Sequence, residues 1–533
     1  MNKVLKSSVW GWWFIALLLV FSIAIIIPFK SALQFGGDDG MELGKAFQYW
    51  GPGEWRESMW NDQPPLYSWI LAGAFHLFGP EAWAARLVSA GFLVVLLVSV
   101  VNLLPPASGT SARLLAIFIV MAISPVCQLG FSVMQELPCM ALACASLAWI
   151  RKPPLAPGRV FVSGMLFGAA VQIKYVALLL APAGFALMWM LTERQENGLK
   201  AMWWNLKAGS KWMSLWGAAM ASTVLFVIVL SGRFDWSQLW TTHAKSAQAE
   251  EAGRLVFAWR EVIAPWWLWL LLITGTVAVI RNRRWADLAF PWIALITVTA
   301  VHSLHRPWWP FYQIHFVIPV ALWAGIGWDA LWNRDSGNEL QSVRDLRLGG
   351  YPLWGALASV CLALAGGLRG LGDQVKSLAS ASPVEHLSVI PEMRRYAKET
   401  RWIYTRDNIF AFSARLPIPP NLLILSKKRF WSGQIREKDI LKLVRQYLPE
   451  QLLLAENREL LNPEWRQFVE KDYVELVADG QLVLFVHRRL NPAMDEVGKP
   501  QQANLLSSLR LTGRKKAPLQ PILDAGNPKD AVR

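Results

Sequence analysis

The sequence contains few charged side chains for its length. Aspartate, glutamate, lysine and arginine make up 17% of its 533 residues, whereas hydrophobic residues make up 54%. Repeated apolar runs of membrane-spanning length account for this composition better than one enlarged soluble core does. The low charge content therefore predicts a polytopic α-helical membrane protein.

Cysteine is also scarce. Four cysteines occur in the chain, and none of them belongs to a Cys-x-x-Cys motif. All lie in or beside predicted spans, so the sequence indicates neither a disulfide framework nor a zinc site. The four are Cys127, Cys139, Cys144 and Cys361.

Apolar stretches predict eleven membrane crossings, near residues 9–28, 84–104, 112–130, 136–150, 160–173, 175–191, 212–231, 263–280, 286–303, 312–332 and 351–370. Lys3 and Lys6 favour a cytoplasmic amino terminus, and positive charge is denser in the predicted inner segments than in the outer ones. We therefore expect a multi-pass protein of the inner (cytoplasmic) membrane, without a cleavable signal peptide. The predicted topology depends on the division of 160–191 at Gln172–Tyr175. One long helix there would place every later segment on the opposite side of the membrane.

The composition changes after residue 370, which divides the chain into parts. Residues 1–370 form the predicted transmembrane catalytic domain, with a first outer loop at 29–83, and 371–490 form a small outer α/β domain. Strands are expected at 402–404, 422–425 and 451–454, a helix at 436–447, and a hairpin at 474–486 around Asp479-Gly480. The outer domain has no phosphate-cradling glycine loop and no nucleophile elbow, which predicts an accessory role. Residues 491–533 are predicted to be a disordered tail.

The formal net charge of +15 does not require a nucleic-acid partner. Orientation signals in the inner loops and attraction to anionic lipid explain it.

The first outer loop carries the most informative polar residues. Asp38 and Asp39 follow the first apolar span, and the loop continues to Gln63-Pro64-Pro65-Leu66-Tyr67. A solvated turn is the simplest interpretation of Gly36-Gly37-Asp38-Asp39-Gly40, since glycine and aspartate favour turns. The rigid Pro-Pro element and the aromatic residues around it favour a site instead.

This combination resembles the polyprenyl-phosphate-sugar-dependent glycosyltransferases of the GT-C fold, in particular the protein O-mannosyltransferase and aminoarabinose-transferase branch. In that family the first outer loop carries an acidic pair, a short helix along the membrane and a Pro-Pro-Leu-Tyr-like segment. The corresponding residues here are 38–39, 41–50 and 64–67, and Ala84-Ala85-Arg86-Leu87 opens the second span. Asp39 departs from the pattern, because many relatives have glutamate there.

The resemblance implies an inverting transfer of sugar from a polyprenyl-phosphate donor to a lipid, glycan or protein acceptor on the outer face. An acceptor hydroxyl needs a base, and Asp38 is the candidate. The departing phosphate needs cations, for which Lys174 and Arg306 are candidates. No cofactor is certain, and a divalent metal ion near Asp39 or Glu136 stays open. The predicted catalytic residues are Asp38, Asp39 and Glu136, and the predicted substrate-binding residues are Lys174, Tyr175, Arg306, Tyr67 and Gln63.

Several of these residues have simpler explanations. Glu136 can be stabilised by the dipole of the helix that it begins, and Lys174 can extend to lipid headgroups as an interfacial anchor. His302, His305 and His315 gather near Arg306 and suggest a metal, yet they lack a recognised ligand motif.

Two other functional classes are alternatives for a polytopic membrane protein. A transporter or lipid flippase would also be polytopic, but such folds usually contain internal repeats, and the sequence has none. A non-catalytic membrane scaffold would leave the acidic loop unexplained.

Overall fold

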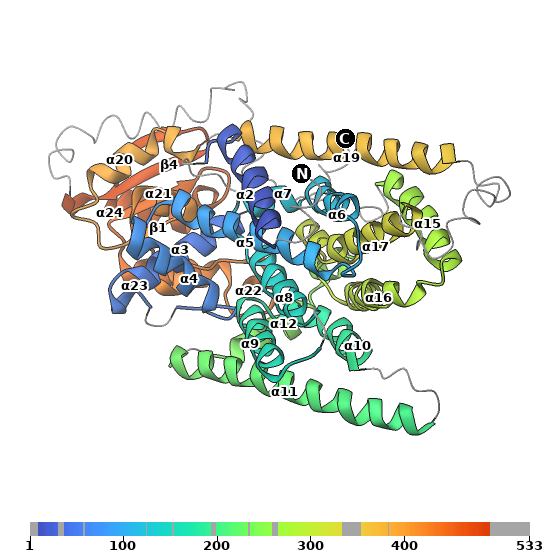
Figure 1. Cartoon of the computed structure of the whole chain (residues 1–533). Helices are drawn as coiled ribbons and strands as arrows, with labels where there is room; N and C mark the ends of the chain where they lie inside the picture. Colours follow the sequence, from blue (N-terminus) through green and yellow to red (C-terminus); the bar gives the residue numbers. More distant parts are fainter. Residues whose placement is uncertain are drawn as a thin grey trace.

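The computed structural model describes residues 9–29, 37–56, 59–123, 125–151, 154–192, 199–232, 235–257, 259, 265–332, 353–381 and 383–490. Helices dominate the part up to Ala379, and a small domain with a four-stranded sheet follows. In Figure 1 this domain lies at one end of the helical part, beside α3 and α4, while α11 and α19 run along opposite edges. The predicted tail at 491–533 lies outside the described residues.

Apolar sequence explains the helices of the larger part. Within the described ranges, five helices are long and apolar enough to cross a membrane, and six shorter apolar helices accompany them. The predicted number of eleven crossings stays a prediction. The helices are α2 (Val9–Ile26), α3 (Asp38–Trp50), α4 (Leu66–Phe78), α5 (Ala82–Leu103), α6 (Thr110–Ala122), α7 (Val126–Gly130), α8 (Glu136–Ile150), α9 (Pro157–Ile173), η2 (Tyr175–Leu180), α10 (Ala181–Thr192), α11 (Leu199–Ser231), α12 (Ser237–Ser246), α13 (Glu250–Arg254), α15 (Trp266–Arg281), α16 (Ala289–Leu304), α17 (Ile314–Trp332) and α19 (Leu353–Ala379), with 3-10 turns η1 (Gly53–Arg56), η3 (Trp285–Leu288) and η4 (Pro310–Gln313).

The division of 160–191 is confirmed. Helix α9 ends at Ile173, and Lys174 is extended, with φ −157° and ψ 129°, before the chain turns helical again at Tyr175. An extended residue between two helices redirects the chain, so 160–191 is not one continuous helix.

Other predicted boundaries need correction. The loop at 29–83 contains an apolar helix, α4, which follows Pro64-Pro65 directly. The predicted span at 112–130 is interrupted, because Pro125 cannot continue the helical hydrogen bonding and separates α6 from α7. The last predicted span continues past residue 370 to Ala379.

The acidic pair does not lie in a turn. Asp38 and Asp39 are the first two residues of α3, which was expected to begin at 41. Gly37 precedes them with φ 80°, a left-handed conformation that glycine adopts without steric cost. Carboxylates in a first helical turn are stabilised by the helix dipole, which explains why the helix begins there.

The outer domain is built on a mixed sheet with the strand order β1-β2-β4-β3. β1 pairs with β2 in parallel, whereas β4 is antiparallel to both β2 and β3. The predicted hairpin is confirmed, with Gly480 at φ 62° in its turn. The strands are β1 (Ile403–Tyr404), β2 (Gln451–Ala455), β3 (Tyr473–Asp479) and β4 (Leu482–His487), and the helices are α20 (Val389–Arg395), α21 (Asn408–Ala414), α22 (Lys427–Trp431), α23 (Glu437–Tyr447) and α24 (Pro463–Asp472), with 3-10 turns η6 (Val384–His386), η7 (Pro420–Leu422), η8 (Glu459–Leu461) and η9 (Arg488–Leu490).

The predicted strand at 422–425 is wrong. Pro419 and Pro420 lead into the 3-10 turn η7 instead. The Ile424 carbonyl accepts a hydrogen bond from the Arg429 side chain rather than from a neighbouring strand. The apolar residues of this segment are buried although they form no strand. Their hydrophobicity alone therefore led to the wrong assignment.

The outer domain packs closely on α3. A Cβ atom at Gly40 would lie 2.8 Å from the backbone nitrogen of Ile409, and one at Gly44 would lie 2.9 Å from a Leu423 methyl group. The Gln48 amide donates a hydrogen bond of 2.5 Å to the Ile418 carbonyl. The helix that begins with the acidic pair is therefore also the docking surface of the outer domain.

We expect Gly40→Ala to weaken this docking, because the added methyl group meets backbone that cannot move aside easily. Overpacking of this kind costs about 1–3 kcal/mol. Thermal unfolding in detergent and limited proteolysis of the outer domain measure the effect. Gly73→Ala on α4 is the matched control, since a Cβ there meets nothing within 4 Å. Equal behaviour of the two variants would contradict the docking interpretation.

Candidate active site

The side chain of Asp39 is held in place by contacts with two other parts of the chain. This side chain is fully buried, one oxygen accepts a hydrogen bond from the Val133 backbone N–H, and the other lies 3.5 Å from the Arg86 guanidinium. Arg86 is likewise buried and is the only charged residue of α5. Burial raises the pKa of Asp39 to about 6, against the opposing effects of Arg86 and the Val133 N–H. The carboxylate is thus ionised at neutral pH and joins α3, α5 and the segment before α8.

Asp38, next to it, has different surroundings. Its side chain is partly buried and forms no hydrogen bond or ion pair within the described part of the chain. Burial raises the pKa of Asp38 to about 7, and the negative charge of Glu136 and of Glu42 adds to the effect. Lys174 and Lys428 oppose it. Asp38 is therefore a carboxyl group that can gain or lose a proton near neutral pH, as a general base must.

Glu136 and Lys174 form a second buried pair. Glu136 is the first residue of α8, Lys174 lies at the break after α9, and the ammonium donates a hydrogen bond to the carboxylate. The break leaves the Lys174 carbonyl free to accept a contact from the Cys139 thiol at 3.1 Å. The pair keeps both charges compensated although each side chain is nearly inaccessible.

A third pair lies one helical turn along α3. The Lys45 ammonium is 2.5 Å from one oxygen of Glu42, and the Gln135 amide donates to the other at 3.0 Å. Gln135 directly precedes Glu136, so this contact also links α3 to the start of α8.

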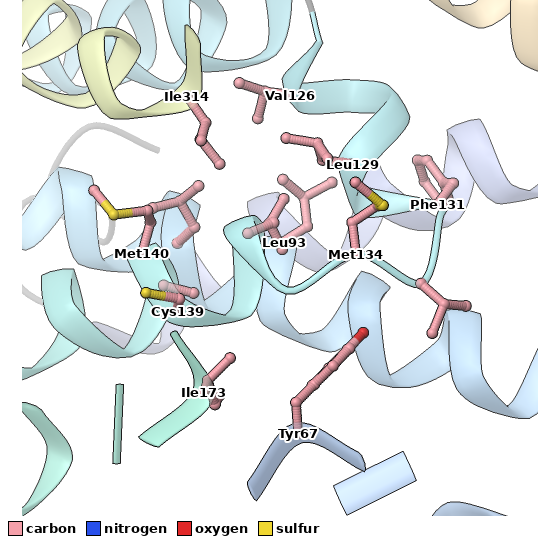
Figure 2. Close-up of a cluster of buried hydrophobic side chains, with 14 of the residues drawn as sticks. Tyr67, Leu93, Val126, Leu129, Phe131, Met134, Cys139, Met140, Ile173 and Ile314 are labelled. Atoms are coloured by element: carbon pink, nitrogen blue, oxygen red, sulfur yellow. The ribbon is translucent and has the colours of Figure 1, made fainter. Parts of the chain in front are cut away.

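An apolar layer supports these polar residues from below. Figure 2 shows part of it, with side chains from α4, α5, α7, α8, α9 and α17 converging. Tyr67 lies at its edge, fully buried, with its hydroxyl 3.1 Å from the Ser89 hydroxyl. The labelled members are Tyr67, Leu93, Val126, Leu129, Phe131, Met134, Cys139, Met140, Ile173 and Ile314.

Aromatic rings border Lys174 on another side. Its ammonium lies 5.8 Å from the ring centre of Phe311 and 5.7 Å from that of Tyr312. Tyr312 stacks in turn on His302, whose Nε2 is 2.9 Å from Nδ1 of His315. This arrangement connects α16 and α17 to the charged residues.

The remaining predicted residues are distributed around this centre. Tyr175 follows Lys174 and packs edge-on against His243, with ring centres 5.2 Å apart. Gln63 is buried and its backbone N–H donates to the Asn61 side chain at 3.1 Å. Arg306 is exposed and donates to the Gly253 carbonyl at 3.1 Å. Its contacts therefore do not bring it to Lys174, with which it was grouped.

A divalent metal ion near Asp39 or Glu136, which the sequence left open, would meet carboxylates that already have partners. Asp39 already accepts from Arg86 and Val133, and Glu136 accepts from Lys174. Within the described ranges no group of three or more histidine, cysteine, aspartate or glutamate side chains could hold a metal ion. His302 and His315 meet each other, and His305 does not complete a ligand set with them.

Sequence reasoning missed Arg86 as a member of the site. The signal was present, because a charged residue within an otherwise apolar span is costly and calls for a partner. Glu42 and Lys45 gave the weaker signal of an i, i+3 pair on a short helix.

We expect Glu136→Gln and Lys174→Gln each to destabilise the protein by about 3–5 kcal/mol, because each leaves a buried charge without its partner. The double variant should lose less than the sum of the two. Unfolding in detergent measures this cycle. Arg254→Gln is the control, since its ion pair with Glu250 is exposed and contributes about 0–1 kcal/mol. Strictly additive losses would contradict a coupled pair.

The chain is similar to known proteins in part of its sequence and in its fold. Residues 62–230 match the family model described as dolichyl-phosphate-mannose-protein mannosyltransferase. A comparison with curated protein sequences gave no match.

Solved structures of ArnT from Cupriavidus metallidurans are similar over almost the whole chain. The structure bound to undecaprenyl phosphate has a TM-score of 0.59 at 14% identity, covering 89% of this chain and 98% of ArnT. The apo structure has a TM-score of 0.58 at 15% identity, covering 90% and 98%. The resemblance predicted from the first outer loop is confirmed. The chain has the multi-pass fold of the GT-C polyprenyl-phosphate-sugar glycosyltransferases, and its segment 62–230 matches their protein mannosyltransferase family.

Proposed function

We propose that the protein is an inverting glycosyltransferase that moves a sugar from a polyprenyl-phosphate donor to an acceptor hydroxyl at the outer face of the inner membrane. The observation that carries the proposal is the contrast between Asp38 and its neighbours. Asp39, Glu42 and Glu136 each accept contacts from a cation, whereas Asp38 forms no such contact within the described residues. An uncommitted carboxyl group with a pKa near neutrality is suited to take a proton from substrate.

The chemistry is a single displacement at the anomeric carbon. The acceptor oxygen forms the new bond while Asp38 takes its proton, and the bond from the anomeric carbon to the phosphate oxygen breaks. The polyprenyl phosphate leaves with the bonding electrons and gains negative charge. Fixed cations stabilise such a developing charge more strongly in a water-poor site than in water.

The paired residues position this chemistry. The Asp39–Arg86 pair holds the first turn of α3, and the Glu136–Lys174 pair holds the start of α8 next to it. We propose that Lys174 faces the leaving phosphate, with Tyr175, Tyr67 and Gln63 along the substrate path. Arg306, exposed beyond this group, is proposed to meet the headgroup region.

A lipid-linked donor suits the location of the site better than a nucleotide sugar does. Helix α3, which begins with Asp38 and Asp39, lies beside the outer domain (Figure 1). The denser positive charge at the opposite end supports an outward orientation of the site. The related ArnT structure contains undecaprenyl phosphate, a ligand whose charge lies at headgroup depth. The chain also lacks a nucleotide-cradling glycine loop. A transporter without glycosyl transfer is not favoured by the family match.

We expect Asp38→Asn to abolish transfer while leaving the unfolding temperature near that of the unmodified protein, because the side chain has no described partner to lose. Turnover of purified variants with a radiolabelled polyprenyl-phosphate sugar measures the rate. Asp373→Asn, an exposed aspartate on α19, is the control and should keep full activity. Half of the native rate in Asp38→Asn would remove Asp38 as the base.

The transfer rate should depend on pH with a midpoint near 7. The base acts only when deprotonated, so activity is full above the Asp38 pKa and falls about tenfold per pH unit well below it. Glu42, Glu136, Lys174 and Lys428 face this carboxyl group and set the midpoint. A pH profile measured at saturating donor tests this expectation. A rate that is constant down to pH 5 would contradict it.

A further inference from the structure

Helix α22 belongs to the outer domain yet lies against the helical part of the protein. It packs on α12, and Figure 1 places its label among α8, α9 and α12. The Gln434 side chain just after it accepts hydrogen bonds from Trp60 at 2.7 Å and from Thr242 at 3.1 Å. The outer domain therefore reaches the site with one short helix.

This helix is held firmly in place. Arg429 is buried and donates to the Asn421 carbonyl at 2.8 Å and the Ile424 carbonyl at 2.9 Å, while its guanidinium lies 4.9 Å from the ring centre of Trp60. Trp431 stacks on Trp309 at 6.4 Å with the ring planes 8° apart. These contacts hold α22 in place against the helical part of the protein.

Lys428 directly precedes Arg429 on this helix. Its side chain is partly buried, and its ammonium has no hydrogen bond or ion pair within the described residues. Its charge acts on Asp38 of α3, on His243 of α12 and on His305 after α16. Helix α22 packs on α12, whose His243 lies against Tyr175 next to Lys174, so Lys428 approaches the site from the outer domain.

Three other cations at the centre of the site are committed to carboxylates, whereas Lys427, whose charge also acts on Asp38, lies 5.7 Å from the ring centre of Trp309. Arg86 pairs with Asp39, Lys45 with Glu42 and Lys174 with Glu136, so each contributes little net positive charge. A phosphate that enters beside Asp38 requires a cation that is not already neutralised, because an uncompensated buried charge is costly. Lys428 meets this requirement.

We propose that Lys428 of the outer domain binds the phosphate group of the lipid-linked donor, so that the outer domain completes the active site. The proposal rests on the proposed function. An ammonium–phosphate contact is charge-assisted and stronger than a neutral hydrogen bond. This contact would strengthen binding of the donor before the transfer step. During the transfer it would stabilise the negative charge of the departing phosphate.

Binding of undecaprenyl phosphate to the full-length protein in detergent tests this proposal. We expect Lys428→Gln to weaken binding about tenfold or more, Lys428→Arg to restore most of it, and the exposed Lys438→Gln to leave it unchanged. Binding of uncharged undecaprenol should be equal in all four proteins. The unfolding temperature of each variant verifies that the fold is intact.

Three results would overturn the assignment. Native binding of undecaprenyl phosphate by Lys428→Gln, with the preference over undecaprenol intact, would overturn the role of Lys428 and leave the glycosyltransferase proposal standing. An equal loss of binding for dioleoyl phosphatidic acid would assign Lys428 to bilayer headgroups. If the unmodified protein did not prefer undecaprenyl phosphate to undecaprenol, both proposals would fail.

Discussion

The buried ion pair between Asp39 and Arg86 is the interaction on which the rest of the site depends. Two charges removed from water are tolerated only together, so the pair fixes the first turn of α3 against α5. The Val133 N–H adds the segment before α8 to the same carboxylate. Asp38 is placed by this anchoring although it has no described contact of its own. Two adjacent carboxyl groups therefore have opposite requirements. Asp39 must be paired to hold the site together, whereas Asp38 must stay unpaired to accept a proton.

Local sequence was sufficient to predict much of this arrangement. The acidic pair, the start of α8 at Glu136 and the interruption at Lys174 were all recognised, because polar residues among apolar ones mark helix ends. The ion-pair partner of Asp39 was not recognised, since Arg86 lies 47 residues further along the chain. The predicted strand at 422–425 failed for the same reason, because burial there comes from docking and not from a sheet.

Paired charges also occur at the opposite end of the helices. Asp329, near the end of α17, is 2.9 Å from Arg284 and accepts the Gly109 N–H at 2.8 Å. Ile314 begins the same helix in the apolar layer beneath the site, about 22 Å away for a regular helix. The protein therefore has compensated charges at both ends and an apolar layer between them, as a bilayer-spanning fold requires.

The close contact of Gly40 with Ile409 has a consequence for biosynthesis. Gly40 emerges early during translation, whereas Ile409 follows after nearly all of the predicted spans have been made. Contacts between residues so distant in sequence form late, because the intervening chain must first be ordered. Helix α3 is therefore without its docking partner until the region around Ile409 has been synthesised. Docking of this domain on α3 is consequently a late step in the folding of the chain.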